Sequence, residues 1–205
     1  KDRMYTMPAT SRGRRSAQSA MYHIAESLTR LLAPILSFTA EEIWPYLPGK
    51  REASVFLATR YDRWPQFKDD PMGPGFWDEV IAVRQAVSRE LERLRVAGGI
   101  GSALNAEVDL YCEPKLYETL ARLGHELRFV FICSEARVHA LDKRPTNAVE
   151  TPVPGLSVQV APSAHAKCVR CWHQRPDVGA HPDHPLICGR CVENISGRGE
   201  LRSYA

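Results

Sequence analysis

The sequence of residues 167–194, KCVRCWHQRPDVGAHPDHPLICGRCVEN, contains four of the six cysteines of the chain. They form two C-x-x-C pairs, Cys168 with Cys171 and Cys188 with Cys191, and sixteen residues separate the pairs. A two-residue gap lets a tight turn aim both thiolates at one point, and two such turns supply four soft ligands at the corners of a tetrahedron. The spacing therefore predicts one Zn²⁺ ion held by these four cysteines.

A site closed by four cysteines leaves no open position for water or substrate, so the predicted zinc is structural rather than catalytic. The tail has few large apolar side chains, and metal binding is expected to supply most of its folding free energy. We expect Gly189, which follows the third cysteine, to permit the backbone twist of the second turn. The metal would therefore shape a surface, and the residues on that surface decide what the tail binds.

Two other uses of the cysteines are weighed against zinc. Disulfides fit a secreted protein, but residues 1–15 are polar and basic, and no apolar segment of a secretory signal follows them. A redox C-x-x-C pair is expected at the start of a helix after a strand, whereas these pairs lie in a loop-rich tail. Four histidines in the tail could compete with the cysteines as metal ligands. Because four thiols are available, we expect these histidines at the surface instead; they are His165, His173, His181 and His184.

Trp172 directly follows the second cysteine, and cationic or imidazole side chains surround it in the sequence. An aromatic ring among cations can stack on an unpaired base while arginines hold phosphates. The alternative, which we favour for the ring, is that Trp172 forms the hydrophobic cover of a small zinc core. Phosphate contact is the expectation for the arginines near the cysteines, which are Arg170, Arg175 and Arg190.

The first part of the chain predicts a helical bundle. Apolar residues recur at steps of three and four over residues 11–36, which is the pattern of one helical stripe; they are Ala17, Ala20, Met21, Ile24, Leu28, Leu31, Leu32 and Ile35. Pro34 is expected to kink or end this helix. Thr39 and Glu42 fit a capping box that would start a second helix, ended at residues 48–49. Arg12, Arg14 and Arg15 make the beginning of the first helix basic.

The middle of the chain predicts a long helix and then a small α+β module. Residues 76–97 are amphipathic and end at two glycines. Residues 106–112 alternate as a strand does, residues 127–140 are expected to be mostly strand, and residues 155–163 form another strand. A helix over residues 114–124, loops over residues 60–75 and an irregular stretch over 143–155 complete this part.

We therefore expect a mainly α fold with three domains. Residues 1–75 form a helical bundle, residues 76–162 hold the long helix and the α+β module, and residues 163–205 form a four-cysteine module similar to a zinc ribbon. The chain has 205 residues with 44% hydrophobic side chains, which suffices for a sizeable core. No apolar run is long enough for a membrane span.

Charge is distributed unevenly along the sequence. Residues 1–60 carry nine Lys and Arg against five Asp and Glu, and residues 161–205 carry six against four. Residues 61–160 are acidic, with twelve basic against fifteen acidic side chains. A polyanion is therefore expected to contact the two ends of the chain rather than the middle.

Four segments together resemble one family. Residues 168–205, CVRCWHQRPDVGAHPDHPLICGRCVENISGRGELRSYA, look like the C-terminal zinc-binding tail of bacterial isoleucyl-tRNA synthetases. Residues 28–49, LTRLLAPILSFTAEEIWPYLPG, resemble the anticodon-binding helical domain shared by the isoleucyl, valyl, leucyl and methionyl enzymes of class I. Residues 1–26 and residues 123–138 also resemble the family, in the right order. The resemblance covers essentially the whole chain, and the zinc tail is its most specific part.

The resemblance implies that the chain is the C-terminal fragment of a cytoplasmic, monomeric enzyme. The parent enzyme would join L-isoleucine to its tRNA, consuming ATP and releasing AMP and pyrophosphate on catalytic and editing domains that lie elsewhere in the same chain. The fragment itself would recognise the anticodon and its stem, which present unpaired bases and phosphates. The expected tRNA contacts are Trp172, Arg170, Arg175, Arg190, His173, Arg12, Arg14 and Arg15; a solvated helix end is the alternative for the last three.

No catalytic signature of class I enzymes is found in this sequence. The HIGH and KMSKS motifs are missing, since YHIAE at residues 22–26 shares only two letters with the first. No glycine-rich turn stands between a strand and a helix to hold phosphates. We therefore expect neither a catalytic nor an editing site in the fragment. The main alternative is a free-standing, zinc-stabilised RNA-binding or scaffold protein, and a zinc-dependent hydrolase is less favoured because no open metal site is evident.

Overall fold

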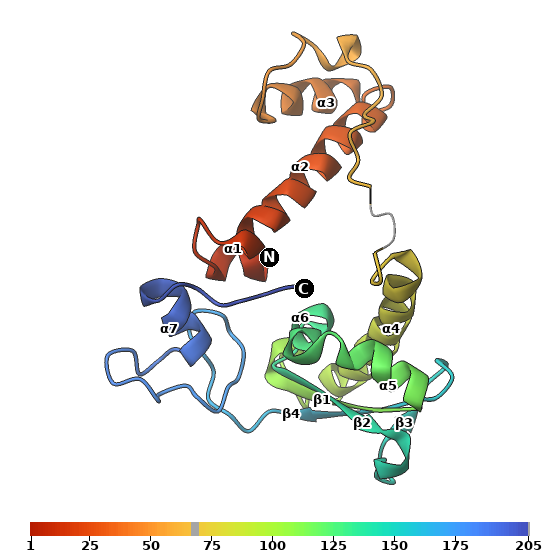
Figure 1. The fold of residues 1–205 in the computed structure, drawn as a ribbon, viewed down its shortest axis with the longest axis vertical. Coiled ribbons are helices and arrows are strands. Elements are labelled where there is room, and N and C mark those ends of the chain that lie inside the picture. The colour runs from red at the N-terminus through yellow and green to blue at the C-terminus, as the bar shows by residue number, and fades with distance from the viewer. Residues whose placement is uncertain (67–69, 205) are drawn as a thin grey trace.

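The structure is a computed structural model that describes residues 1–66 and 70–204 (Figure 1). A helical arm of residues 1–66 projects away from a sheet body of residues 70–163, and the cysteine tail of residues 164–204 lies beside both. The described residues combine α-helices with one four-stranded mixed sheet. The expectation of a mainly α fold is therefore only roughly correct, because the middle of the chain is organised around a sheet.

The helical arm contains α1 (Asp2–Thr6), α2 (Arg12–Leu32) and α3 (Ser37–Ile43). The Ser11 hydroxyl accepts a hydrogen bond from the Arg14 amide at 3.3 Å and caps the start of α2. The helix ends at Leu32, just before Pro34, whose ring nitrogen has no hydrogen to continue the backbone ladder. The predicted helix over residues 11–36 is confirmed with a slightly earlier end.

The apolar stripe of α2 does not face a core within the described residues. Ile24, Leu28 and Leu31 are 53%, 51% and 62% exposed. The helix instead buries Glu26 and Thr29 on its other side. Arg51, from the extended segment after α3, donates to the Glu26 carboxylate at 3.0 Å. The expected bundle is therefore present only as a helix pair with a packed loop.

The capping box predicted at the start of α3 is wrong. The helix begins at Ser37, two residues before Thr39, and no side chain caps it. The neighbouring Glu41 carboxylate accepts hydrogen bonds from the Ser54 hydroxyl at 2.9 Å and the Val55 amide at 3.0 Å. Glu41 thus secures a distant loop rather than the first turn of its own helix.

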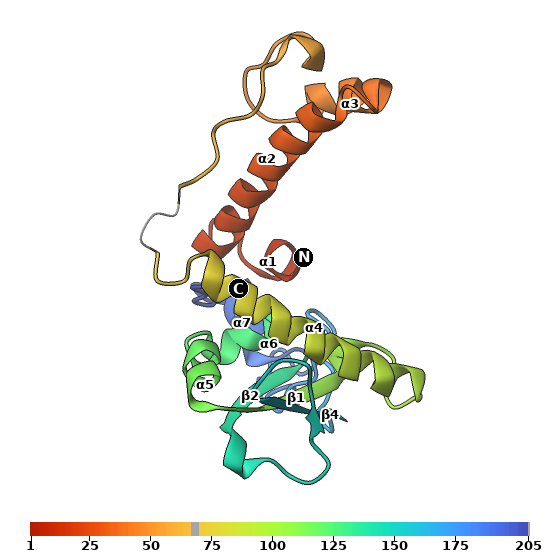
Figure 2. The same cartoon turned by 90° about the vertical axis from the view of Figure 1, so that its right-hand side faces the viewer.

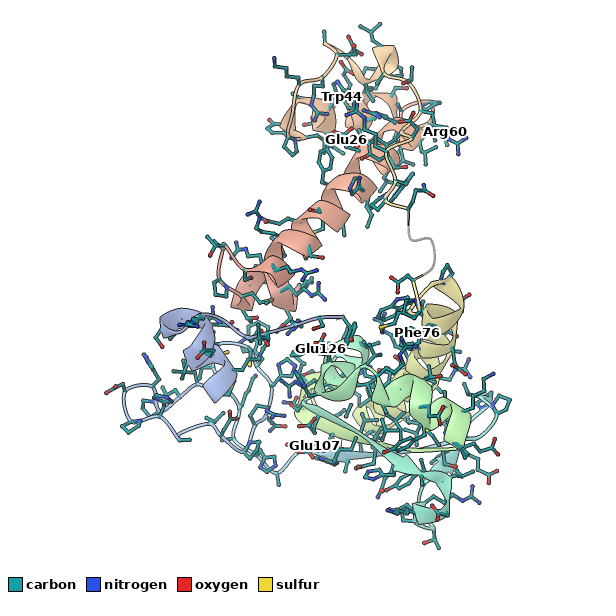
Figure 3. The ribbon with its side chains drawn as sticks, in the orientation of Figure 1. Glu26, Trp44, Arg60, Phe76, Glu107 and Glu126 are labelled. Carbon is teal, nitrogen blue, oxygen red and sulfur yellow. The ribbon has the colours of Figure 1, made fainter. Side chains whose placement is uncertain are left out.

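A small core closes the far end of the arm. Trp44 is 2% exposed and packs with Ala33, Ala40 and Val55. The Trp44 indole donates to the Glu52 carbonyl at 2.8 Å, so its polar atom is satisfied on burial. Figure 3 shows Trp44 and Glu26 together at this end, remote from the cysteine tail.

The sheet body begins with α4 (Pro74–Val96). Four strands follow, β1 (Ala106–Cys112), β2 (Glu135–Ala140), β3 (Val149–Glu150) and β4 (Leu156–Pro162). Their order is β2-β1-β4-β3, with β2 parallel to β1 and β4 antiparallel to both of its neighbours. Two short helices, α5 (Pro114–Ala121) and α6 (Leu127–Phe131), lie between β1 and β2 in the sequence.

The long helix α4 packs on the sheet as its periodicity predicts (Figure 2). Val80, Val83, Val87 and Leu91 are buried in one core with alternate residues of β1. Gly98 takes a left-handed backbone with φ of 77° and ends the helix. The predictions for the helices at 76–97 and 114–124 and for the strands at 106–112 and 155–163 are confirmed within a few residues.

The segment 127–140 was expected to be mostly strand, and its first half is helical instead. Leu127 and Phe131 lie one helical turn apart on α6 and are both buried. Ile132 then adopts a left-handed conformation, with φ of 59°, before β2 begins. Periodicity cannot separate a short buried helix from a buried strand in such an apolar run. The loop predicted over 60–75 includes residues 67–69, which lie outside the described residues.

The cysteine tail is mostly loop and ends in α7 (Gly189–Ser196) and an extended segment. Figure 1 places α7 beside α1, although the two helices stand at opposite ends of the sequence. None of the helices in the described ranges combines the length and apolar character that crossing a membrane requires.

Candidate metal centre and nucleic-acid surface

The four predicted cysteines converge on one point. Their sulfur atoms all lie within 4.8 Å of one another, and all four residues are buried. The Cys171 and Cys188 sulfurs are 3.7 Å apart. A zinc tetrahedron with Zn–S bonds of ~2.3 Å has sulfur–sulfur edges of about 3.8 Å. The convergence of the four sulfurs is therefore compatible with their binding one tetrahedral ion.

Two short turns present the sulfurs. In the first, the Trp172 amide donates to the Cys168 carbonyl at 2.9 Å, and the Cys168 amide donates to the His173 carbonyl at 2.9 Å. In the second, the Val192 amide donates to the Cys188 carbonyl at 3.0 Å as α7 begins. The Cys188 amide also lies 3.4 Å from the Cys168 sulfur, which joins the two turns.

Gly189 has a different role from the one expected. It is not among the residues with a positive φ, so the backbone twist of the second turn does not require glycine. Its amide donates to the Asp177 carboxylate at 2.9 Å, and an added Cβ would approach that carboxylate to 2.9 Å. The glycine therefore provides space for Asp177, which holds the second turn against the loop.

The thiols titrate against one another. Hydrogen bonds from Cys188 and Cys191 lower the pKa of Cys171, whereas the bond that Cys188 gives to Cys171 raises its own pKa to about 12. The pKa of Cys191 is raised for the same reason. The thiolate of Cys171 is thus favoured and ionisation of Cys188 and Cys191 is opposed, so a cation is needed before these three can ionise together.

The two remaining cysteines take no part in this site. Cys112 and Cys133 lie in the core of the sheet body. Burial raises the pKa of each thiol to about 12, which makes both inert at neutral pH.

His173 is buried, contrary to the expectation that the histidines of the tail are surface residues. It is 4% exposed, its edge meets Phe129 with ring centroids 5.6 Å apart, and its Nδ1–H donates to the Cys171 carbonyl at 3.2 Å. The buried imidazole therefore stabilises the first cysteine turn through its hydrogen bond to the Cys171 carbonyl and its contact with Phe129. His165 and His181 are exposed and His184 is half-buried.

Trp172 is exposed, contrary to its expected role as a cover for the zinc core. The side chain is 60% exposed, and Lys167 Nζ lies 5.8 Å from its ring centroid. Its backbone is left-handed, with φ of 68°, which costs a non-glycine residue on the order of 1–3 kcal/mol. The turn therefore carries strain that directs a large aromatic ring into solvent beside a cation.

The three tail arginines that were expected to contact phosphates make internal contacts instead. Arg190 donates to both Asp2 carboxylate oxygens at 2.9 Å and to Glu200 at 3.0 Å, and its side chain is only 11% exposed. Arg170 donates to the Thr6 carbonyl at 2.8 Å. Arg175 forms an ion pair with Glu135. The structure thus uses these guanidinium groups to join the tail to the arm and to the sheet body.

Three arginines lie in the first turn of α2. Arg12 and Arg15 are exposed, whereas Arg14 is half-buried and donates to the Met7 carbonyl at 3.3 Å. Of these three side chains, only that of Arg14 is engaged in a hydrogen bond within the described residues.

Sequence reasoning missed a charged junction between the two ends of the chain. Asp2 pairs with Arg190 and with Arg202, whose side chain is 1% exposed. Burial opposes ionisation of Asp2, but the hydrogen bonds and charges of these two arginines outweigh it and lower its pKa. The buried Glu126 carboxylate accepts from the Ser203 and Tyr204 amides, each at 2.7 Å, and fixes the last segment (Figure 3). No local pattern could have revealed partners so distant in sequence.

The chain is similar to known protein families over its whole length. A model described as the anticodon-binding domain of tRNA ligase matches residues 1–110, and one described as a zinc finger found in FPG and IleRS matches residues 167–194. Isoleucine–tRNA ligases of Nitrosococcus oceani, Methylococcus capsulatus and Halorhodospira halophila are 59%, 54% and 57% identical. Each alignment covers 100% of this chain and 22% of the relative. The chain thus spans about a fifth of the length of these relatives.

Adjacent substitutions test the placement of Trp172 and His173. Trp172→Ala should change the free energy of unfolding of the metal-loaded tail by less than about 0.5 kcal/mol, because the ring is exposed. His173→Ala should cost about 1–3 kcal/mol, because it leaves the buried Cys171 carbonyl without its donor. The measurement is the urea concentration at which the loaded chain releases zinc to a chromophoric indicator. Equal costs for the two substitutions would contradict this placement.

Proposed function

We propose that this chain, which belongs to the family of anticodon-binding domains of tRNA ligases, is the tRNA-reading end of an isoleucine–tRNA ligase. The parent would ligate L-isoleucine to its tRNA with ATP, on catalytic and editing domains outside this chain, as a cytoplasmic monomer. The fragment carries no catalytic or editing site in this proposal. The observation that carries it is the similarity of the entire chain to isoleucine–tRNA ligases, combined with an exposed tryptophan on a convergent four-cysteine site.

We further propose that one Zn²⁺ binds to Cys168, Cys171, Cys188 and Cys191. The sulfur spacing and the match to a zinc-finger family support this assignment. The zinc would supply a structural cross-link between the two cysteine turns. Side chains of the protein would fix the two cysteine turns: His173 bonds to the first turn and Asp177 to the second. The first turn would then present Trp172 to solvent.

The proposed tRNA surface consists of exposed groups on the tail and on the arm. The Trp172 ring would stack on an unpaired anticodon base, with the Lys167 ammonium beside it for a phosphate. Arg12 and Arg15 would contact the backbone of the anticodon stem. Four other side chains already form hydrogen bonds or ion pairs within the protein, and we propose that they assist tRNA binding indirectly by holding this surface in place. They are Arg170, Arg175, Arg190 and His173.

The exposed apolar face of α2 also accords with a larger parent protein. Leu28 and Leu31 are exposed on this helix, Ile35 is exposed after its end, and Phe38 is exposed on α3. Exposed apolar side chains gathered in this way are a common site of contact with another segment. In the proposed parent, further helices of the same chain would cover it and complete the bundle. In this proposal the chain has three domains, formed by residues 1–75, 76–162 and 163–205.

Trp172→Ala should weaken tRNA binding about ten- to a hundredfold, because a stacked base contributes ~1–3 kcal/mol. Fluorescence titration with an isoleucine tRNA and with the same tRNA carrying another anticodon measures this. The wild-type chain should prefer the first tRNA, and its affinity for both should fall as salt rises. Tyr117→Ala, which removes an exposed aromatic ring of the sheet body, is the matched control and should bind as wild type. An unchanged affinity of Trp172→Ala would refute the stacking contact.

Metal analysis of chain prepared without chelator should find about one zinc per molecule. Cys188→Ser should lose it, because three thiolates form an incomplete site. The helix signal of α2 and α4 in circular dichroism should persist, because their contacts lie outside the cysteine cluster. Cys112→Ala, the control for loss of a buried thiol, should retain the zinc. Zinc-free wild-type protein, or zinc bound equally by Cys188→Ser, would rule out this site.

A further inference from the structure

Two arginines stand between the cysteine sulfurs and the N-terminal helix α1. Arg170 Nη1 lies 3.8 Å from the Cys191 sulfur and 2.8 Å from the Thr6 carbonyl. Arg190 directly precedes Cys191 in the sequence and donates to both carboxylate oxygens of Asp2. Arg170 therefore contacts a sulfur of the metal site on one side and the helical arm on the other, and Arg190 joins the second cysteine turn to the arm.

One of the two arginines has a charge that is available to an occupied site. Four thiolates around Zn²⁺ leave two net negative charges, and the Arg170 guanidinium can offset one of them, whereas Arg190 is already paired with the Asp2 and Glu200 carboxylates. Among the ion pairs of the described residues, Arg170 has no carboxylate partner, so the nearby sulfur is its available anion. Without a metal-bound thiolate beside it, this half-buried guanidinium would lose its counter-charge, which is unfavourable.

The same junction extends to the sheet body. Arg202 pairs with Asp2 at 2.5 Å, and its guanidinium carbon lies 3.4 Å from the ring centroid of Phe129 on α6. The Arg190 guanidinium carbon lies 5.0 Å from the same ring. Asp2 on α1 is thus paired with Arg190 and Arg202, and both guanidinium groups also contact Phe129 of the sheet body. The polar contacts that join the arm to the tail and the body therefore meet at α1.

A displacement of α1 would be transmitted to α2. The Met7 carbonyl accepts from Arg14 of α2 at 3.3 Å, and a Cβ added at Gly13 would lie 2.7 Å from the Met7 side chain. This close packing makes the first turn of α2 follow the short helix. Arg12 and Arg15, the proposed stem contacts, lie on that turn.

We propose that Arg170 and Arg190 are positioning residues that couple metal binding at the four cysteines to the docking of α1, and so set the helical arm relative to Trp172. This inference rests on the proposed function, because it assigns the arm and the tail to one tRNA surface. Coupling between two binding events is reciprocal. Docking of α1 therefore raises the zinc affinity by the same factor by which zinc favours docking.

Reciprocity makes Asp2 the sharpest test, because it contacts no cysteine. Asp2→Asn, Arg170→Gln and Arg190→Gln are compared with wild type in the whole chain, with zinc affinity measured by competition against a chromophoric chelator. Groups that hydrogen-bond to metal ligands typically contribute ten- to a hundredfold in metal affinity. We expect about that loss for the two arginine variants, and a loss of about tenfold for Asp2→Asn. Arg198→Gln removes an exposed arginine of the same tail and should bind zinc as wild type.

Hydrogen exchange of residues 2–6 supplies a second readout that does not depend on tRNA. Removing zinc from the wild-type chain should speed exchange in α1, and Arg190→Gln should do the same with zinc bound. The coupling is overturned if Asp2→Asn binds zinc like wild type, or if α1 stays equally protected without metal. Wild-type chain that binds no zinc would overturn the metal assignment and the coupling together. Loss of tRNA binding with these responses intact would overturn only the proposed function.

Discussion

Four thiols enclosed in one small pocket are the constraint on which the rest of the tail depends. They cannot all ionise together without a cation, because each thiolate opposes the next. The apolar support around them is small, consisting mainly of Ile187, Val192 and Val178. A tail with so little core is expected to draw its order from a metal cross-link rather than from burial of apolar surface. Its surface features therefore depend on the metal site.

The cysteine site also determines which polar groups remain available for a partner. The arginines close to the sulfurs are occupied by Asp2, Glu200 and the Thr6 carbonyl, so they act inside the protein. The strained turn at Trp172 has the opposite effect, because it holds an aromatic ring in solvent. A chain rich in arginine is thus proposed to contact RNA directly through the Trp172 ring and Lys167 on the tail and through two arginines on the arm.

Much of this architecture is encoded locally and could be predicted from the sequence. The spacing of the valines predicts the buried face of α4, alternation predicts β1, and the cysteine spacing predicts the convergence of the sulfurs. These features depend on neighbours within one helix, strand or turn. Periodicity could not show that the apolar face of α2 is the exposed one, because it identifies two faces without identifying what covers each.

The features that the sequence did not reveal are those made by distant partners. Asp2 and Arg190 are 188 residues apart, and neither lies in a pattern that points to the other. The exposure of Trp172 and the burial of His173 depend on where the sheet body and Phe129 lie around the cysteine turn. The same holds for α6, whose short apolar sequence suits a strand until its buried side chains meet the core on one helical face.

The central claim is that four sulfur ligands, and no other atoms, hold the metal. A sulfur-only site would carry two net negative charges beside the Arg170 guanidinium, which has no carboxylate partner among the ion pairs of the described residues. X-ray absorption at the zinc edge of the metal-loaded chain tests this most directly. The account predicts four sulfur atoms at ~2.3 Å and no nitrogen or oxygen bound to the zinc. A spectrum that requires a nitrogen or oxygen ligand at ~2.0–2.1 Å, as a histidine or water would give, would contradict it.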